Sequence, residues 1–177
     1  MQNNEKIGAQ INLLKIAANT EFDYEFDQDT EWIKEMLVEL NENATDKTPD
    51  EWLKETSLVV FGEMTKKDKP DMGEFLLVKG TIEATYATEC VRTLKPMKKD
   101  LDIPFKVCFL DQSMAETEMF KDVDETYVEN DVYEIYFFDK RTVDFQAMIH
   151  EQIFLHVDLY PILDANSKLD GVDTPEA

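Results

Sequence analysis

The segment from Gly73 to Pro104 constrains the fold of this chain more than any other. Within it, an extended run over residues 74–78 precedes Lys79-Gly80, and a second extended run covers residues 81–88. Glycine between two such runs is typical of a turn, so the pattern predicts a pair of strands joined at Lys79-Gly80. The second strand leads into Glu89-Cys90-Val91-Arg92-Thr93-Leu94-Lys95-Pro96, which we call the knuckle.

The N-terminal third of the chain carries both kinds of apolar periodicity. Residues 9–18 and 21–27 are predicted to be strands, and the second run alternates aromatic with acidic side chains. A helix is predicted to begin after Asp29 or Thr30 and to end near residues 41–43, because apolar residues recur there at three- and four-residue spacing. A second, shorter helix follows the capping sequence Thr48-Pro49-Asp50-Glu51, and both helices are expected to pack on a sheet.

The remaining elements complete an α+β pattern. Strands are predicted over 58–64, 102–110 and 132–138, with a loop over 112–131. Thr142 or Asp144 caps a last helix with one apolar face: Phe145, Met148, Ile149, Gln152, Ile153 and His156. We therefore expect an antiparallel sheet, curled toward a barrel, with two or three packed helices.

Length and composition indicate one domain. The chain has 177 residues, of which 43% are apolar, enough for a single core over residues 1–163, followed by a polar tail over 164–177 that we expect to be disordered. No apolar run reaches the roughly 18 residues of a membrane span, and the N-terminus lacks the pattern of a secretory signal. The sequence thus predicts a cytoplasmic protein without a membrane partner. Cys90 and Cys108 are its only cysteines, so no disulfide framework is indicated.

The net charge of -21 is concentrated at the two ends of the chain. Residues 1–50 carry 12 acids and 4 bases, residues 51–110 carry 10 of each, and residues 111–177 carry 17 acids and 4 bases. Such a chain is repelled by a polyanion as a whole, which argues against unaided binding of nucleic acid. The balanced middle nevertheless gathers cations, which either neutralise neighbouring acids or contact a partner or RNA: Arg92, Lys95, Lys98, Lys99 and Lys106.

The knuckle resembles the hallmark of the YceD family of bacterial and plastid proteins, a glycine and a strand followed by Glu-Cys-x-Arg-Cys-Leu-x-Pro. Val143-Asp144-Phe145 and Glu151-Gln152-Ile153-Phe154-Leu155 look like two further family signatures, and the resemblance extends over residues 9–163. It implies a non-enzymatic factor that supports accumulation of large-subunit (23S) ribosomal RNA, in ribosome assembly or precursor processing. The motif residues in register are Gly80, Glu89, Cys90, Arg92, Leu94, Pro96, Asp144 and Glu151.

Neither metal binding nor catalysis is predicted. Many members of the resembled family pair the knuckle cysteines with a C-terminal cysteine cluster spaced like a zinc site. Here Thr93 replaces the second knuckle cysteine, and Leu163, Ser167 and Gly171 stand at the C-terminal positions. Structural zinc needs about four Cys or His ligands. The serines lie in no nucleophile motif and the glycines are isolated, so no catalytic residue and no cofactor is expected.

Charge and resemblance together predict how the chain acts. Its acidic ends suit a basic ribosomal protein or assembly factor, while Arg92, Lys95, Lys98 and Lys99 are candidates for contact with that partner or, locally or indirectly, with ribosomal RNA. For Arg92 a structural alternative stays open, a salt bridge that fixes the strand end. The alternative function is an acidic mimic of nucleic acid or another protein–protein interaction module. The oligomeric state is left open.

Overall fold

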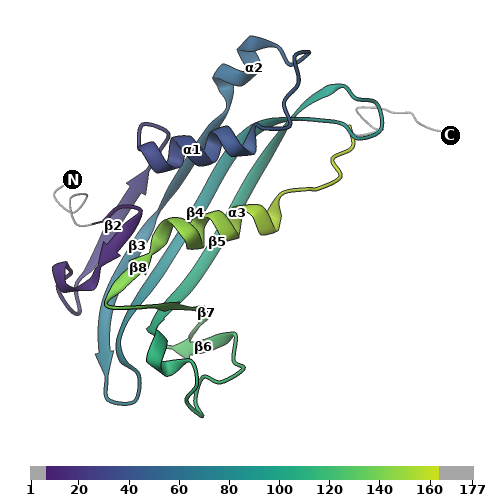
Figure 1. Cartoon of the computed structure of the whole chain (residues 1–177). Helices are drawn as coiled ribbons and strands as arrows, with labels where there is room; N and C mark the ends of the chain where they lie inside the picture. Colours follow the sequence, from purple (N-terminus) through teal and green to yellow (C-terminus); the bar gives the residue numbers. More distant parts are fainter. Residues whose placement is uncertain (1–6, 164–177) are drawn as a thin grey trace. The chain divides into compact units, whose positions relative to one another are not determined.

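The computed structural model describes residues 7–163 (Figure 1). These residues divide into two compact units. The described residues of the first unit are 7–26, 60–82 and 103–155, and those of the second are 27–59, 83–102 and 156–163. In chain order the elements are β1 (Gln10–Asn12), η2 (Leu13–Lys15), β2 (Glu21–Phe26), α1 (Glu31–Leu40), α2 (Asp50–Glu55), β3 (Ser57–Lys69), β4 (Gly73–Glu89), β5 (Pro96–Asp111), η3 (Gln112–Met114), β6 (Glu125–Val128), β7 (Asp131–Phe138), β8 (Thr142–Asp144) and α3 (Phe145–His156).

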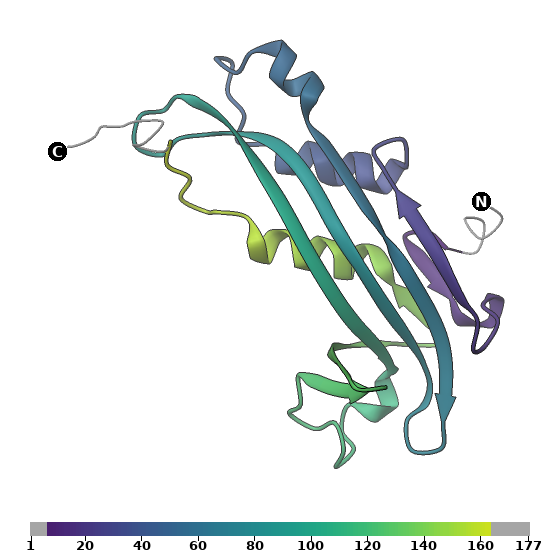
Figure 2. The same ribbon diagram turned by 180° about the vertical axis from the view of Figure 1, so that it is seen from behind.

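The α+β class is confirmed, but the predicted closure of the sheet is wrong. Six strands pair in the order β2-β3-β4-β5-β7-β6, so the sheet is open, with edge strands β2 and β6 (Figure 2). It is also not purely antiparallel, because β5 and β7 pair in parallel from Val107 with Glu134 to Asp111 with Phe138. A small second sheet joins β1 to β8. Alternating apolar residues predict that a segment is a half-buried strand, but they do not predict which strand it pairs with. For this reason the sequence did not reveal the open order of the strands or the parallel pair.

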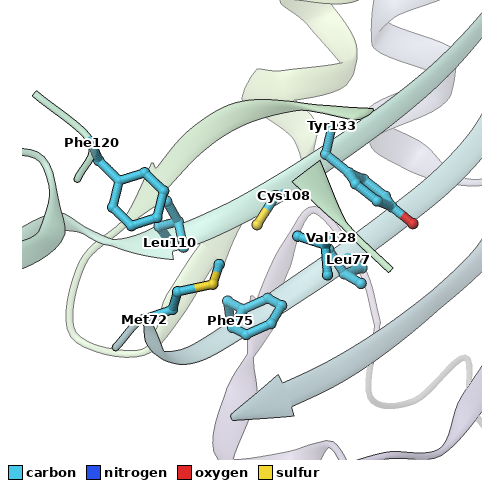
Figure 3. Packing of buried hydrophobic residues seen from close by; sticks show 8 residues of the cluster. All are labelled: Met72, Phe75, Leu77, Cys108, Leu110, Phe120, Val128 and Tyr133. Atoms are coloured by element: carbon cyan, nitrogen blue, oxygen red, sulfur yellow. The ribbon is translucent and has the colours of Figure 1, made fainter. Parts of the chain in front are cut away.

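Both faces of the sheet carry packed apolar side chains within the first unit. On the helix face, Tyr24 of β2 meets Phe145 of α3, with ring centroids 5.4 Å apart and an interplanar angle of 86°. On the opposite face, which we call the outer face, β6 and the segment before it cover a separate apolar cluster (Figure 3). This outer cluster consists of Met72, Phe75, Leu77, Cys108, Leu110, Phe120, Val128 and Tyr133. The predicted loop over 112–131 therefore contains η3 and β6 and contributes to a core.

The predicted turn at Lys79-Gly80 is wrong, because β4 runs unbroken through both residues. Gly80 serves close packing instead: a Cβ atom there would lie 2.3 Å from the Tyr24 hydroxyl and 2.7 Å from Phe105 Cζ. The Tyr24 hydroxyl donates a hydrogen bond to the carbonyl of Lys79, 3.1 Å away. Glycine inside a strand often marks such an approach rather than a bend.

Two other local predictions need correction. The strand expected over 9–18 stops at Asn12, whose side-chain oxygen accepts a hydrogen bond from the Leu14 N–H and caps η2. The short helix α2 follows Pro49 as its N-cap, whereas the Thr48 hydroxyl accepts from the Thr45 N–H. Contrary to expectation, α2 buries none of its side chains.

In the second unit, α1 confirms the predicted helix and its Thr30 boundary. Its buried residues follow the predicted spacing, and Asn41 continues the contact beyond its end. The Asn41 side chain donates to the Thr56 hydroxyl (3.2 Å) and accepts from the Ala87 N–H (2.8 Å). Asn41 thus ties the end of α1 to β4. The residues that α1 buries are Trp32, Ile33, Met36 and Leu40.

Within residues 7–163, no helix has the length and apolar character needed to cross a membrane. The prediction of a disordered tail over 164–177 lies outside the described residues.

Candidate functional site

The knuckle is a tight loop between the end of β4 and the start of β5 in the second unit. The Cys90 N–H donates to the Lys95 carbonyl (2.9 Å), and the Leu94 N–H donates to the Cys90 carbonyl (2.9 Å). Leu94 adopts a φ of 59°, a left-handed conformation that is uncommon for a residue other than glycine. Two backbone hydrogen bonds and this conformation reverse the chain within six residues, from Cys90 to Lys95.

The thiol of Cys90 is the centre of the knuckle. Its sulfur accepts hydrogen bonds from the backbone N–H groups of Thr93 (3.4 Å) and Leu163 (3.2 Å). A third contact joins the same segments, because the Val91 N–H donates to the Pro161 carbonyl (2.9 Å). The chain after α3 is therefore fastened to the knuckle by hydrogen bonds. Thr93 and Leu163 are two of the positions that the resemblance aligned with cysteines, and here their backbone N–H groups are donors to the Cys90 sulfur.

The two thiols of the chain differ in acidity because their surroundings differ. Burial raises the pKa of the Cys90 thiol, but hydrogen bonds to its sulfur from the Leu163 N–H and from Thr93 outweigh this effect and lower the pKa to about 7. At Cys108 burial raises the pKa to about 12, and the charge of Lys69 offsets only part of that rise. Cys90 is therefore the thiol that ionises near neutral pH.

We predict that the thiolate absorbance of the folded chain rises with a midpoint near pH 7, which Cys90→Ser abolishes. Thr93→Val removes the hydroxyl donor and should move the midpoint to higher pH. A midpoint at the ordinary thiol value of about 8.5 in the wild type would contradict the geometry. Since the folded pKa lies below the unfolded one, ionisation of Cys90 stabilises the fold above the unfolded pKa, and this stabilisation is lost as the pH falls through about 7.

The four predicted contact cations fall into two pairs. Lys98 binds the Glu55 carboxylate (2.8 Å) and lies over the Trp52 ring, 5.4 Å from its centroid, while Lys99 lies 3.8 Å from the Asp158 carboxylate. Arg92 and Lys95 are exposed on the knuckle, and neither forms an ion pair with another residue in the range 7–163. The salt bridge considered for Arg92 is thus not formed within the described chain. Arg92 and Lys95 are the cations that remain available to a partner.

Three of the other motif residues, Gly80, Asp144 and Glu151, belong to the first unit, whereas the knuckle belongs to the second. Asp144 caps α3 by accepting a hydrogen bond from the Ala147 N–H (3.0 Å), as predicted. Glu151 accepts from the Tyr136 hydroxyl (2.6 Å) and so ties α3 to β7. Glu89, at the end of β4, is half-buried. These contacts give Asp144, Glu151 and Gly80 roles in the fold.

The sequence shows a row of acidic residues on one face of β2, but it does not show which residues of other strands lie beside that row. Glu21, Asp23 and Glu25 are exposed, and strand pairing places Asp23 directly opposite Glu63 of β3. Like charges at opposed positions repel each other. Alternation in residues 21–27 reveals the row, whereas Glu63 joins it only through the register between β2 and β3.

In the described part of the chain, no group of three or more His, Cys, Asp or Glu side chains is arranged to hold a metal ion. The model of the family described as "Large ribosomal RNA subunit accumulation protein YceD" matches residues 78–176, which is more than half of the chain and includes the knuckle. No curated protein and no solved structure matches the chain.

Proposed function

We propose, because this chain belongs to the YceD family of large ribosomal RNA subunit accumulation proteins, that it is a non-enzymatic factor that binds a basic ribosomal protein or assembly factor. The family description gives the broad role, accumulation of large-subunit ribosomal RNA. Binding of a basic partner would support that role by holding the partner soluble and available until it meets the RNA. We place such a factor in the cytoplasm.

The observation that supports a basic partner is the surplus of exposed acid over available base. The net charge is -21, and many of the cations in the described chain are already bound to carboxylates. Acidic surfaces of this kind accelerate the encounter with a cationic protein and repel free RNA. The cations with carboxylate partners are Lys66, Lys67, Lys79, Lys98, Lys99, Lys106 and Arg141.

A mimic of nucleic acid is the weaker alternative. Mimicry needs carboxylates spaced along one surface like phosphates, without interruption. In the second unit, Arg92 and Lys95 are exposed on the knuckle beside the apolar side chains of Val91 and Leu94, which are 48% and 55% exposed. A surface of this composition suits contact with a protein, or with RNA that a bound partner already holds.

Co-purification with the tagged full chain tests the proposal. We expect basic ribosomal proteins or assembly factors to be recovered at about 0.05 M salt and lost at about 0.5 M, because salt screens contacts between exposed charges. Recovery should survive ribonuclease treatment if the contact is with protein. Failure to recover any basic protein at low salt would contradict the proposed function.

A further inference from the structure

A polar cavity of about 270 Å³ lies on the outer face of the first unit, at the margin of the outer cluster. Leu77 and Tyr133 belong both to that cluster and to the cavity wall. In Figure 3 the Tyr133 hydroxyl points away from Phe120 and the rest of the cluster. The other lining residues are Asn19, Glu21, Glu63, Thr65, Lys67, Lys79 and Glu129.

The charges that line this cavity do not cancel. Lys67 is paired with Glu129, and Lys79 lies 3.1 Å from the carboxylate of Asp131, which also binds Lys106 at 2.7 Å. Each lining cation therefore already has a carboxylate. Glu21 and Glu63 have no ion-pair partner among residues 7–163, so the cavity carries an excess of negative charge.

The pairing of β2 with β3 brings a further carboxylate close to Glu63. Asp23 stands directly opposite Glu63, and Glu21 and Asp23 project on the same face of β2 because they are two residues apart. The repulsion between these carboxylates would be relieved by a positive group bound between them. Tyr133 already has the Lys79 ammonium 5.9 Å from its ring centroid, so the cavity wall accommodates a cation beside an aromatic ring.

We propose that this cavity binds a lysine ammonium or arginine guanidinium group from a basic segment of the partner protein. The segment would lie along the acidic row of β2, with one cationic side chain in the cavity between Glu21 and Glu63. This inference rests on the proposed function, because it locates the contact with the basic partner. An anionic ligand is the opposing possibility, for which Lys67 and Lys79 would have to leave their carboxylates.

The test uses the full chain and a fluorescent peptide of alternating arginine and glycine, with binding followed by anisotropy at about 0.05 M salt. We expect Glu21→Gln/Glu63→Gln to weaken binding about tenfold, a loss of about 1.4 kcal/mol. The control Glu35→Gln/Glu42→Gln removes the same charge from exposed positions in the second unit and should change affinity less than about twofold. Equal losses in the two variants would overturn the cavity as the binding site.

A third variant tests the sign of the ligand's charge. Lys67→Gln removes a cation from the wall and frees Glu129, so binding of the peptide should tighten by about threefold, or about 0.65 kcal/mol. Weaker binding would indicate an anion site and overturn the proposal. If basic proteins co-purify with the wild type and with Glu21→Gln/Glu63→Gln equally well, the proposed function survives and the cavity proposal fails. If the wild type binds neither peptide nor basic protein, both fail.

Discussion

Replacement of Lys66 by methionine is expected to lower the free energy of unfolding by about 3 kcal/mol, because it leaves the partly buried Glu74 carboxylate without its nearest cation. Lys66 is only 8% exposed, and its ammonium group lies 3.3 Å from Glu74 and donates to the Leu13 carbonyl at 2.9 Å. Arg141 approaches the same carboxylate, but at 3.7 Å and from an exposed position. Lys66 thus joins η2, β3 and β4 in the first unit.

Urea denaturation of three variants separates the charge effect from loss of packing. Lys66→Met/Glu74→Met removes both charges and should recover at least half of the loss, since replacing a buried ion pair with apolar groups is often close to neutral. Lys34→Met, an exposed position on α1, should change stability by less than about 0.5 kcal/mol. If Lys66→Met is as mild as Lys34→Met, the ion pair does not hold the first unit together.

Elements that depend on local sequence could be predicted, while features that depend on distant partners could not. The starts of α1 and α3 follow from apolar spacing, with Thr30 at the N-cap position of α1 and Asp144 capping α3 through its side chain. Because β5 and β7 pair in parallel, the chain between them must return to the end of the sheet from which β7 starts. No residue pattern in the sequence predicts this return. The same limit explains why an open sheet was expected to curl, and why β6 was taken for part of a loop.

The candidate site shows the same division. The sequence identified the knuckle and its cations, because they are contiguous. It could not show that the N–H of Leu163, distant in sequence, donates to Cys90, or that Lys98 is bound to Glu55. The cavity was missed altogether, since its lining comes from β2, β3, β4, β7, the segment before β2 and the turn that holds Glu129. Only the register between strands brings these side chains together.

Replacement of Gly62 by alanine is expected to destabilise the chain by about 3 kcal/mol or more, at the upper end of the usual effect of overpacking. Gly62 of β3 is the cross-strand partner of Tyr24. An alanine Cβ at this position would lie 2.0 Å from the Lys79 carbonyl oxygen and 2.6 Å from the Gly80 Cα atom. Both are backbone atoms of β4, so the clash is relieved only if the two strands separate.

Tyr24 explains why two glycines stand side by side here. Its ring crosses β3 at Gly62, so that its hydroxyl reaches the Lys79 carbonyl and the position above Gly80, while its ring packs on Phe145. At Gly80 the nearest clash of an added Cβ is with that hydroxyl, which is a side-chain atom. Gly80→Ala should therefore be milder than Gly62→Ala, at about 1–3 kcal/mol.

A double-mutant cycle separates the two glycines. Tyr24→Phe removes the hydroxyl that Gly80→Ala would strike, so the double variant should be more stable than the sum of the single effects by about 0.5–1 kcal/mol. The same Tyr24→Phe change should give no such relief to Gly62→Ala, whose clash is with the backbone of β4. Gly8→Ala is the matched control, because no atom lies within 4 Å of its added Cβ. If Tyr24→Phe reduces the loss of stability equally in Gly80→Ala and in Gly62→Ala, the clash of Gly62→Ala with the backbone of β4 is contradicted.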